Sequence, residues 1–170
     1  ALSQGIRKIA IAIDGSATND GGMGMLAALG VRFLDESGSL LRGCGGDLEK
    51  VASIDLSGLH PAIGETEFTV MCDVTNPLLG PEGATFTFSA QKGADAVMQQ
   101  CLEAGMAHYA ELAEKATGVP AREVPGAGAA GGLGFALMSF LGANLQSGIE
   151  TVLDLVHFDE LLKDADLVVT

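Results

Sequence analysis

The hydrophobic positions of the chain fall into short runs and longer stripes, separated by polar loops rich in glycine. Helical spacing predicts a helix over residues 96–117, a centrally buried apolar helix over 132–145, and two shorter helices over 149–156 and 158–163. Short apolar runs predict buried strands at 8–13, 68–72 and 167–170, with an edge segment at 85–88. Strands separated by helical patterns predict an α/β fold, in which a mixed sheet is flanked by helices.

The first apolar run ends in a loop of glycines and short polar side chains, and a helical pattern follows from Gly22. Small residues allow a backbone to approach a ligand closely. A polar loop between a strand and a helix directs backbone N–H groups at an anion, and ligands of open α/β sheets bind at the carboxyl ends of strands. The loop therefore predicts an anion site, and we assign to it Ser16, Thr18, Asn19, Gly21 and Gly22.

Two aspartates follow predicted strands on loops that also carry amide and hydroxyl side chains. Asp20 stands beside Thr18 and Asn19, and Asp73 precedes Thr75 and Asn76. If the two strands are parallel neighbours, both loops face one cleft. Phosphoryl transfer requires a metal holder and a group that accepts the substrate's proton, and Mg²⁺ takes one or two carboxylates. Asp20 and Asp73 are thus the predicted catalytic residues, one of them holding Mg²⁺. Either aspartate alone is equally typical of a turn or a helix cap.

A glycine run matches the pattern G-x-G-x-x-G at residues 126–131. The dinucleotide interpretation requires a strand directly before the run, which Pro125 disfavours. A site for phosphate or a carboxylate at the start of the next helix fits better. Gly126 and Gly128 are expected to be functional, because helix packing needs no glycine before the helix. For Gly131 and Gly132, packing and binding are equal alternatives.

Composition limits the partners of the chain. The net charge of −13 argues against nucleic acid, and only nine residues are Lys or Arg. Lys92 is therefore a candidate point charge for an anion, with an ordinary exposed lysine as the alternative. Three widely spaced cysteines form neither a disulfide framework nor a zinc site, and Cys72 and Cys101 are expected to be buried thiols. With no signal peptide and no apolar stretch of about 20 residues, we expect a cytoplasmic protein without membrane contact.

Four separated motifs together resemble bacterial type I glycerate kinases: GSATNDGG with the helical stretch after it, CDVTNPL, QKGA and PGAGAAGGLG. The resemblance implies phosphorylation of glycerate by ATP with Mg²⁺, and the 2-phosphate more than the 3-phosphate. It also implies that Lys92, Asn76 and the glycine run bind anionic groups. The sequence departs from the family at Asp14, where glycine is frequent, and at Ser89-Ala90, where Gly-Pro is frequent.

Family members are longer and have two α/β domains, so the chain is interpreted as a single domain, the second and inserted one. Its expected partner is then the missing first domain, and the isolated chain is expected to be inactive because it lacks both flanks of the family, including the loop after Thr170. Two other functions remain open. One is a non-catalytic module that binds small anions, and the other is a fragment of a nicotinamide-dependent oxidoreductase based on the glycine pattern.

Overall fold

The computed structural model describes residues 1–163 and 165–167. Strands and helices are interspersed along the chain, as the apolar runs predict. The strands are β1 (Lys8–Ala12), β2 (Arg32–Leu34), β3 (Ser53–Asp55), β4 (Glu67–Met71) and β5 (Asn144–Gln146). The helices are α1 (Met23–Ala28), α2 (Ala84–Phe88), α3 (Ala96–Thr117), α4 (Ala129–Leu141), α5 (Gly148–Leu155) and α6 (Phe158–Leu162). Short 3-10 turns cover Leu2–Gln4, Gly45–Lys50, Pro61–Glu65 and Ala90–Lys92.

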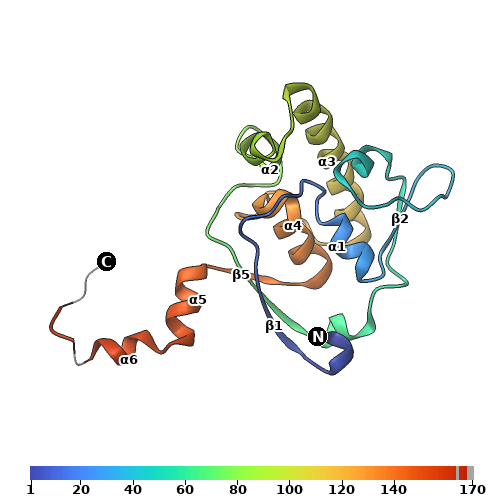
Figure 1. Cartoon of the computed structure of the whole chain (residues 1–170). Coiled ribbons are helices and arrows are strands. Elements are labelled where there is room, and N and C mark those ends of the chain that lie inside the picture. The colour runs from blue at the N-terminus through green and yellow to red at the C-terminus, as the bar shows by residue number, and fades with distance from the viewer. Residues whose placement is uncertain (164, 168–170) are drawn as a thin grey trace.

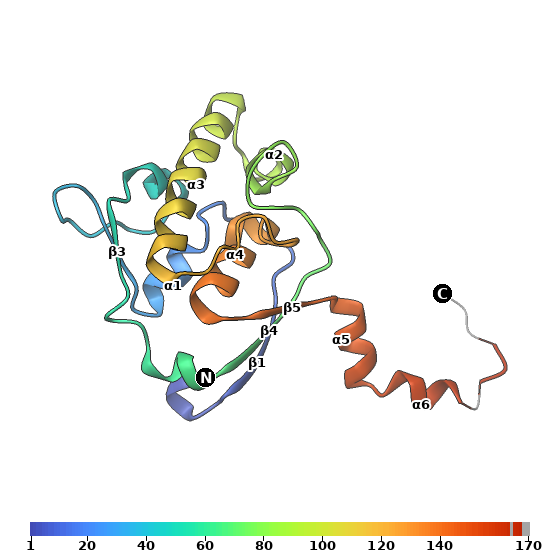
Figure 2. The ribbon, with the colours of Figure 1, turned by 180° about the vertical axis from the view of Figure 1, so that it is seen from behind.

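A three-stranded parallel sheet in the order β1-β4-β5 forms one layer of the fold. Helices α1 to α4 gather on one side of this sheet, and α5 and α6 project away from the body as an arm (Figures 1 and 2). The predicted α/β fold is thereby confirmed. Strands β2 and β3 pair antiparallel and form a separate two-stranded sheet.

The two faces of the parallel sheet differ in burial. Alternate residues of the strands point to one face, where Phe68 and Val70 are buried beneath the helices. On the other face Ala10 and Ala12 of β1 are exposed. The prediction that residues 8–13 are buried on both faces is therefore wrong for β1, which lies at an edge of the described sheet.

The core lies between the sheet and the long helix α3. Tyr109 of α3 is fully buried between the rings of Phe33 and Phe135, each with its centroid 6.0 Å away in an edge-to-face arrangement. The prediction of α3 is confirmed to the residue, since Asp95 caps its first turn by accepting from the N–H of Met98 at 2.8 Å.

Several local predictions differ from the structure. Residues 85–88 belong to helix α2 rather than to an edge segment, and the helix predicted over 132–145 ends at Leu141 before β5. Cys101 is exposed and Cys72 is only half-buried. The strand predicted at 167–170 lies mostly outside the described residues, and Leu167 itself is in no strand. Among the described helices, none combines the length and the hydropathy that a membrane crossing requires.

Candidate active site

The loop that follows β1 interlocks with the glycine run at the start of α4. The N–H of Gly21 donates to the carbonyl of Gly131 at 3.0 Å, and the hydroxyl of Thr18 donates to the carbonyl of Ala130 at 3.5 Å. These two segments are more than a hundred residues apart in the chain. Their contact confirms that the structure brings the first loop and the glycine run together.

Close packing explains why glycine occupies most positions of this run. A Cβ on Gly131 would lie 2.0 Å from the carbonyl oxygen of Thr18, and one on Gly132 would lie 2.8 Å from the Cα of Gly21. A Cβ on Gly128 would lie 2.2 Å from the carbonyl oxygen of Pro77. Packing against other loops therefore does require glycine before the helix.

The argument that helix packing needs no glycine before the helix was therefore wrong for Gly126 and Gly128. That these two glycines bind a ligand stays a prediction. A Cβ on Gly126 would also collide, at 2.5 Å from Cδ2 of Leu145. Turns rather than a strand precede the run, so the fingerprint of a dinucleotide site lacks its strand.

Lys92 reaches the first loop from the 3-10 turn that follows α2. Its ammonium donates to the hydroxyl of Ser16 at 3.0 Å and to the carbonyl of Thr18 at 2.6 Å. Burial lowers the pKa of Lys92 below its usual value, and the negative charge of Asp20 partly offsets this. Lys92 is thus a half-buried cation joined to the predicted anion loop, and the alternative of an ordinary exposed lysine is excluded.

A cavity of about 140 Å³ lies between Lys92, the ends of two parallel strands and the start of α4. Its walls include Asp14, Ser16, Val74, Lys92, Ala129 and Ala130. This position, at the carboxyl ends of the strands, is where α/β sheets bind ligands. The cavity is therefore the candidate active site.

Asp14 is a carboxylate at this site that the sequence reasoning did not assign a role. β1 and β4 are parallel, with Ala12 opposite Met71, so continuing the register places Asp14 opposite Asp73. Burial raises the pKa of the Cys72 thiol, and the charges of Asp14 and Asp73 add to that effect. Both carboxylates therefore lie near Cys72 at the edge of the sheet.

Asp20 stands at the start of α1, where it accepts from two backbone N–H groups. Oδ1 accepts from Gly22 at 2.9 Å, and Oδ2 accepts from Gly24 at 3.3 Å. Burial raises the pKa of nearby Tyr109, and Asp20 adds to the effect. Both oxygens of Asp20 are engaged by the helix, as a capping residue's would be.

Asp73 is exposed and accepts through a single oxygen. Oδ1 accepts from the Ser147 hydroxyl at 3.2 Å and from the N–H of Gly148 at 2.8 Å, at the start of α5. No hydrogen bond to Oδ2 is formed by the described residues. Asp73 therefore keeps one oxygen available at the end of β4, which Asp20 does not.

The two asparagines of the predicted site hold loops together. Asn76 donates to the carbonyl of Glu82 at 2.7 Å, and Asn19 donates to the hydroxyl of Thr85 at 3.3 Å. Gly21 and Gly22 are buried against Tyr109 and Ala136 rather than lining the cavity. Of the predicted residues, Ser16, Thr18 and Lys92 meet directly beside the cavity.

The oxygen ligands here suit Mg²⁺ in kind, since Mg²⁺ needs only one or two carboxylates and keeps its waters. Within residues 1–163 and 165–167, no group of three or more His, Cys, Asp or Glu side chains is placed to hold a metal. The carboxylates at the ends of β1 and β4, Asp14 and Asp73, are the ones the fold places at the same edge. These two residues would hold Mg²⁺, which would supply positive charge for the phosphates of a substrate.

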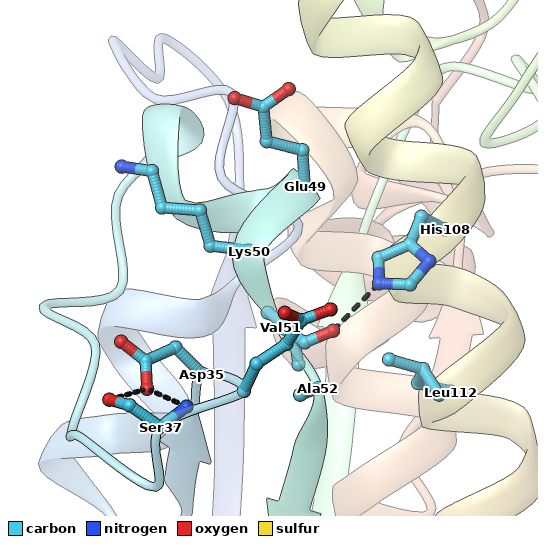
Figure 3. Close-up of a pocket in the computed structure, with 9 residues that line it drawn as sticks. Asp35, Ser37, Glu49, Lys50, Val51, Ala52, His108 and Leu112 are labelled. Atoms are coloured by element: carbon cyan, nitrogen blue, oxygen red, sulfur yellow. Dashed lines mark hydrogen bonds between the residues drawn. The ribbon is translucent and has the colours of Figure 1, made fainter.

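A larger cavity lies elsewhere, between α3 and the loop after β2 (Figure 3). It measures about 490 Å³ and its walls include Asp35, Glu36 and Glu49. Its lysine, Lys50, is paired with Asp47 at 3.2 Å. Three carboxylates with one neutralised cation disfavour an anionic substrate. This cavity also contains none of the predicted site residues.

Sequence comparison agrees with the motifs that meet at the smaller cavity. A model of the glycerate kinase family matches residues 1–170. The chain belongs to the glycerate kinase family. Over 170 residues it is 51% identical to a glycerate kinase from Bacillus subtilis (strain 168) and 49% identical to a glycerate 2-kinase from Escherichia coli (strain K12).

The fold has a close relative among solved structures of the same family. A crystal structure assigned to glycerate kinase 2 from Salmonella typhimurium LT2 superposes with a TM-score of 0.92 at 47% identity, covering 98% of this chain. The chain spans less than half of each relative, namely 44% and 45% of the two curated proteins and 45% of the solved chain.

Proposed function

We propose that this chain is part of an enzyme that transfers phosphate from ATP to a hydroxyl group of glycerate. The observation that carries the proposal is the meeting of Lys92 with the first loop at a small cavity, in a chain that belongs to the glycerate kinase family. The 2-phosphate is the proposed product, because a relative at 49% identity is named glycerate 2-kinase. The cavity of about 140 Å³ suits a small hydroxy acid.

Lys92, which lines the cavity, and two aspartates of the neighbouring loops, which do not line it, divide the work of binding and chemistry. Lys92 supplies a positive charge for the carboxylate of glycerate or for a phosphate. Asp73, with one oxygen available, accepts the proton of the reacting hydroxyl or helps to hold the metal. Mg²⁺, when bound, neutralises phosphate charge. Asp20 fixes the start of α1 and thereby the shape of the loop.

The first domain that is expected in the full-length protein is a required partner in this proposal. Kinases owe most of their rate to positioning and to charge stabilisation, which half of a cleft cannot supply. We therefore expect residues 1–170 alone to release ADP from ATP and glycerate at a negligible rate. Turnover comparable with that of the full-length protein would show that the remaining sequence is dispensable.

Kinetics of the full-length protein test the assignment. Asp73→Asn preserves size and removes charge, and it should lower kcat by roughly 10²-fold or more. Asp55→Asn is the matched control, since Asp55 also accepts from a backbone N–H through Oδ1, that of Ser57 at 2.9 Å, but lies on β3, outside the parallel sheet whose strand ends border the cavity. Lys92→Ala should mainly raise KM, because a point charge acts on bound and reacting anions alike.

The same measurements separate the kinase from a module that only binds anions. Such a module would bind glycerate, lose binding in Lys92→Ala, and show no ADP release even at full length. Wild-type kcat in the Asp73→Asn variant would remove Asp73 from the chemistry and move the catalytic carboxylate to another residue. The glycine run without its strand gives the oxidoreductase alternative no structural support.

A further inference from the structure

A second hollow also borders Lys92. It measures about 250 Å³ and is lined by Asn19, Gly45, Gly46, Lys92, Met98 and Leu102 among others. An adjacent hollow of about 250 Å³ shares four of these residues, Gly45, Gly46, Met98 and Leu102, and extends the space along α3. Lys92 therefore lines both the small cavity and a longer groove, and the part of the groove that extends along α3 is mainly apolar.

The groove has an apolar wall because the first turns of α3 are not covered by other described residues. Met98 is 50% exposed, whereas Met106 two turns later on the same helix is fully buried. Leu102 is half-buried between them. A flexible thioether at a groove wall is well suited to contact with an aromatic ring.

The floor of the groove is backbone. A Cβ on Gly45 would lie 2.8 Å from the carbonyl oxygen of Asn19 and 3.0 Å from Cδ2 of Leu102, so no side chain fits there. The hollow next to Lys92 has no carboxylate in its lining, and the adjacent hollow has one, Glu49. A glycine-lined surface, an apolar wall and a cation at one end match a nucleotide, which has a planar base and an anionic tail.

We infer that the groove beside Met98 binds the base of the nucleotide, with the phosphates directed toward Lys92. This inference rests on the proposed function. The hydroxy acid then occupies the small cavity of Asp14 and Ser16, and the two substrates meet at the ammonium of Lys92. Met98, at the apolar start of α3, is thus a determinant of nucleotide affinity.

Equilibrium binding to the full-length protein tests the inference without relying on turnover. Adenosine, ATP and inorganic tripolyphosphate are titrated by calorimetry into the wild type and into Met98→Ala, Met98→Leu and Val97→Ala. Val97 is the matched control, because it is 74% exposed on the same turn but lines neither hollow. Circular dichroism and thermal unfolding confirm that the variants fold.

We expect Met98→Ala to weaken adenosine and ATP about tenfold and to leave tripolyphosphate within twofold. Met98→Leu should restore most of the affinity, and Val97→Ala should change nothing. In steady-state assays Met98→Ala should raise KM for ATP and leave KM for glycerate unchanged. Unchanged adenosine binding in Met98→Ala would overturn the inference, as would an equal loss in Val97→Ala.

The two proposals fail in distinguishable ways. If the wild-type full-length protein turns over glycerate but Met98→Ala binds adenosine normally, only the base site is wrong. If the wild type binds adenosine through Met98 but does not phosphorylate glycerate, the groove stands and the proposed substrate is wrong.

Discussion

Helices α4 and α5 follow from equally clear apolar patterns, yet they have opposite surroundings in the structure. Phe135 and Leu137 of α4 are fully buried. Ile149 and Leu155 of α5 are 59% and 70% exposed, on the arm that projects from the body (Figure 1). Only the first of the two helices finds its cover within the described residues.

The difference shows what an apolar stripe establishes. It marks a surface that must be covered, but it does not say which segment covers it. For α4 the cover is the loop after β1 together with α2 and α3. For the arm, the relatives are more than twice as long as this chain, so we expect the rest of a family-length chain to supply the cover.

Around the covered helix α4, the largest effect on stability is expected from Gly131→Ala. The new Cβ would meet the carbonyl oxygen of Thr18 at 2.0 Å, and the backbone φ of +68° is strained for alanine. Overpacking and the left-handed backbone together should lower the free energy of unfolding by about 2–5 kcal/mol. Urea denaturation of the full-length protein measures the change.

Gly142→Ala separates the two causes. Gly142 has a φ of +63°, but no atom lies within 4 Å of the position of its Cβ. Gly142→Ala should therefore lower the free energy of unfolding through backbone strain alone, by about 1–2 kcal/mol. Equal losses in the two variants would mean that the first loop moves aside without cost, and that the interlock of loop and glycine run is weak.

The elements were predictable where local signals set their limits. The Asp95 cap and the Gly118 stop bound α3, and both act within one turn of the helix. Residues 85–88 were misassigned because a short apolar run suits a strand or a helix equally. The exposure of β1 depends on how many strands the sheet has, which no local pattern contains.

The candidate site was predictable only in part, for a similar reason. Ser16, Thr18 and Lys92 were found because loops of small residues and rare cations are visible in a sequence. Asp14 was missed because its position opposite Asp73 depends on the pairing register of strands more than fifty residues apart. The packing role of Gly126 and Gly128 was missed because packing between distant loops has no sequence signature, and the binding role of the glycine run stays a prediction.

A smaller loss of stability in the body of the protein is expected from Glu114→Gln. Glu114 near the end of α3 accepts from the backbone N–H groups of Ala121 and Arg122, each at 3.0 Å, and pairs with the Arg122 guanidinium. It thereby fixes the segment that leads into the glycine run. Removing its charge leaves a half-buried guanidinium unpaired, and should lower the free energy of unfolding by about 2 kcal/mol at neutral pH.

The pKa of Glu114 predicts how its contribution to stability changes with pH. Burial alone would raise the pKa of Glu114, but the hydrogen bonds and charge of Arg122 outweigh it and hold the pKa below its usual value. The stabilisation is therefore complete above the ordinary glutamate pKa of about 4.3 and is lost as the pH falls through the lower folded-state pKa. The difference between wild type and Glu114→Gln should shrink below about pH 4. A difference that stays constant with pH would show that packing, not charge, is responsible.

The smallest effect, and the one that tests the comparison most directly, concerns the arm. Leu155→Ser should change the stability of residues 1–170 by less than about 0.5 kcal/mol, because the side chain is already exposed there. In the full-length protein the same change should lower the free energy of unfolding by about 1–2 kcal/mol, since a buried leucine would be lost. Leu40→Ser, at a leucine that is 65% exposed on the body, is the control and should be neutral in both chains. Denaturant unfolding of the four variants, each against its parent, gives the measurement. If Leu155→Ser leaves the stability of the full-length protein unchanged, the arm stays uncovered there too. Helix α5 would then be an exposed helix, and not one that another part of the chain covers.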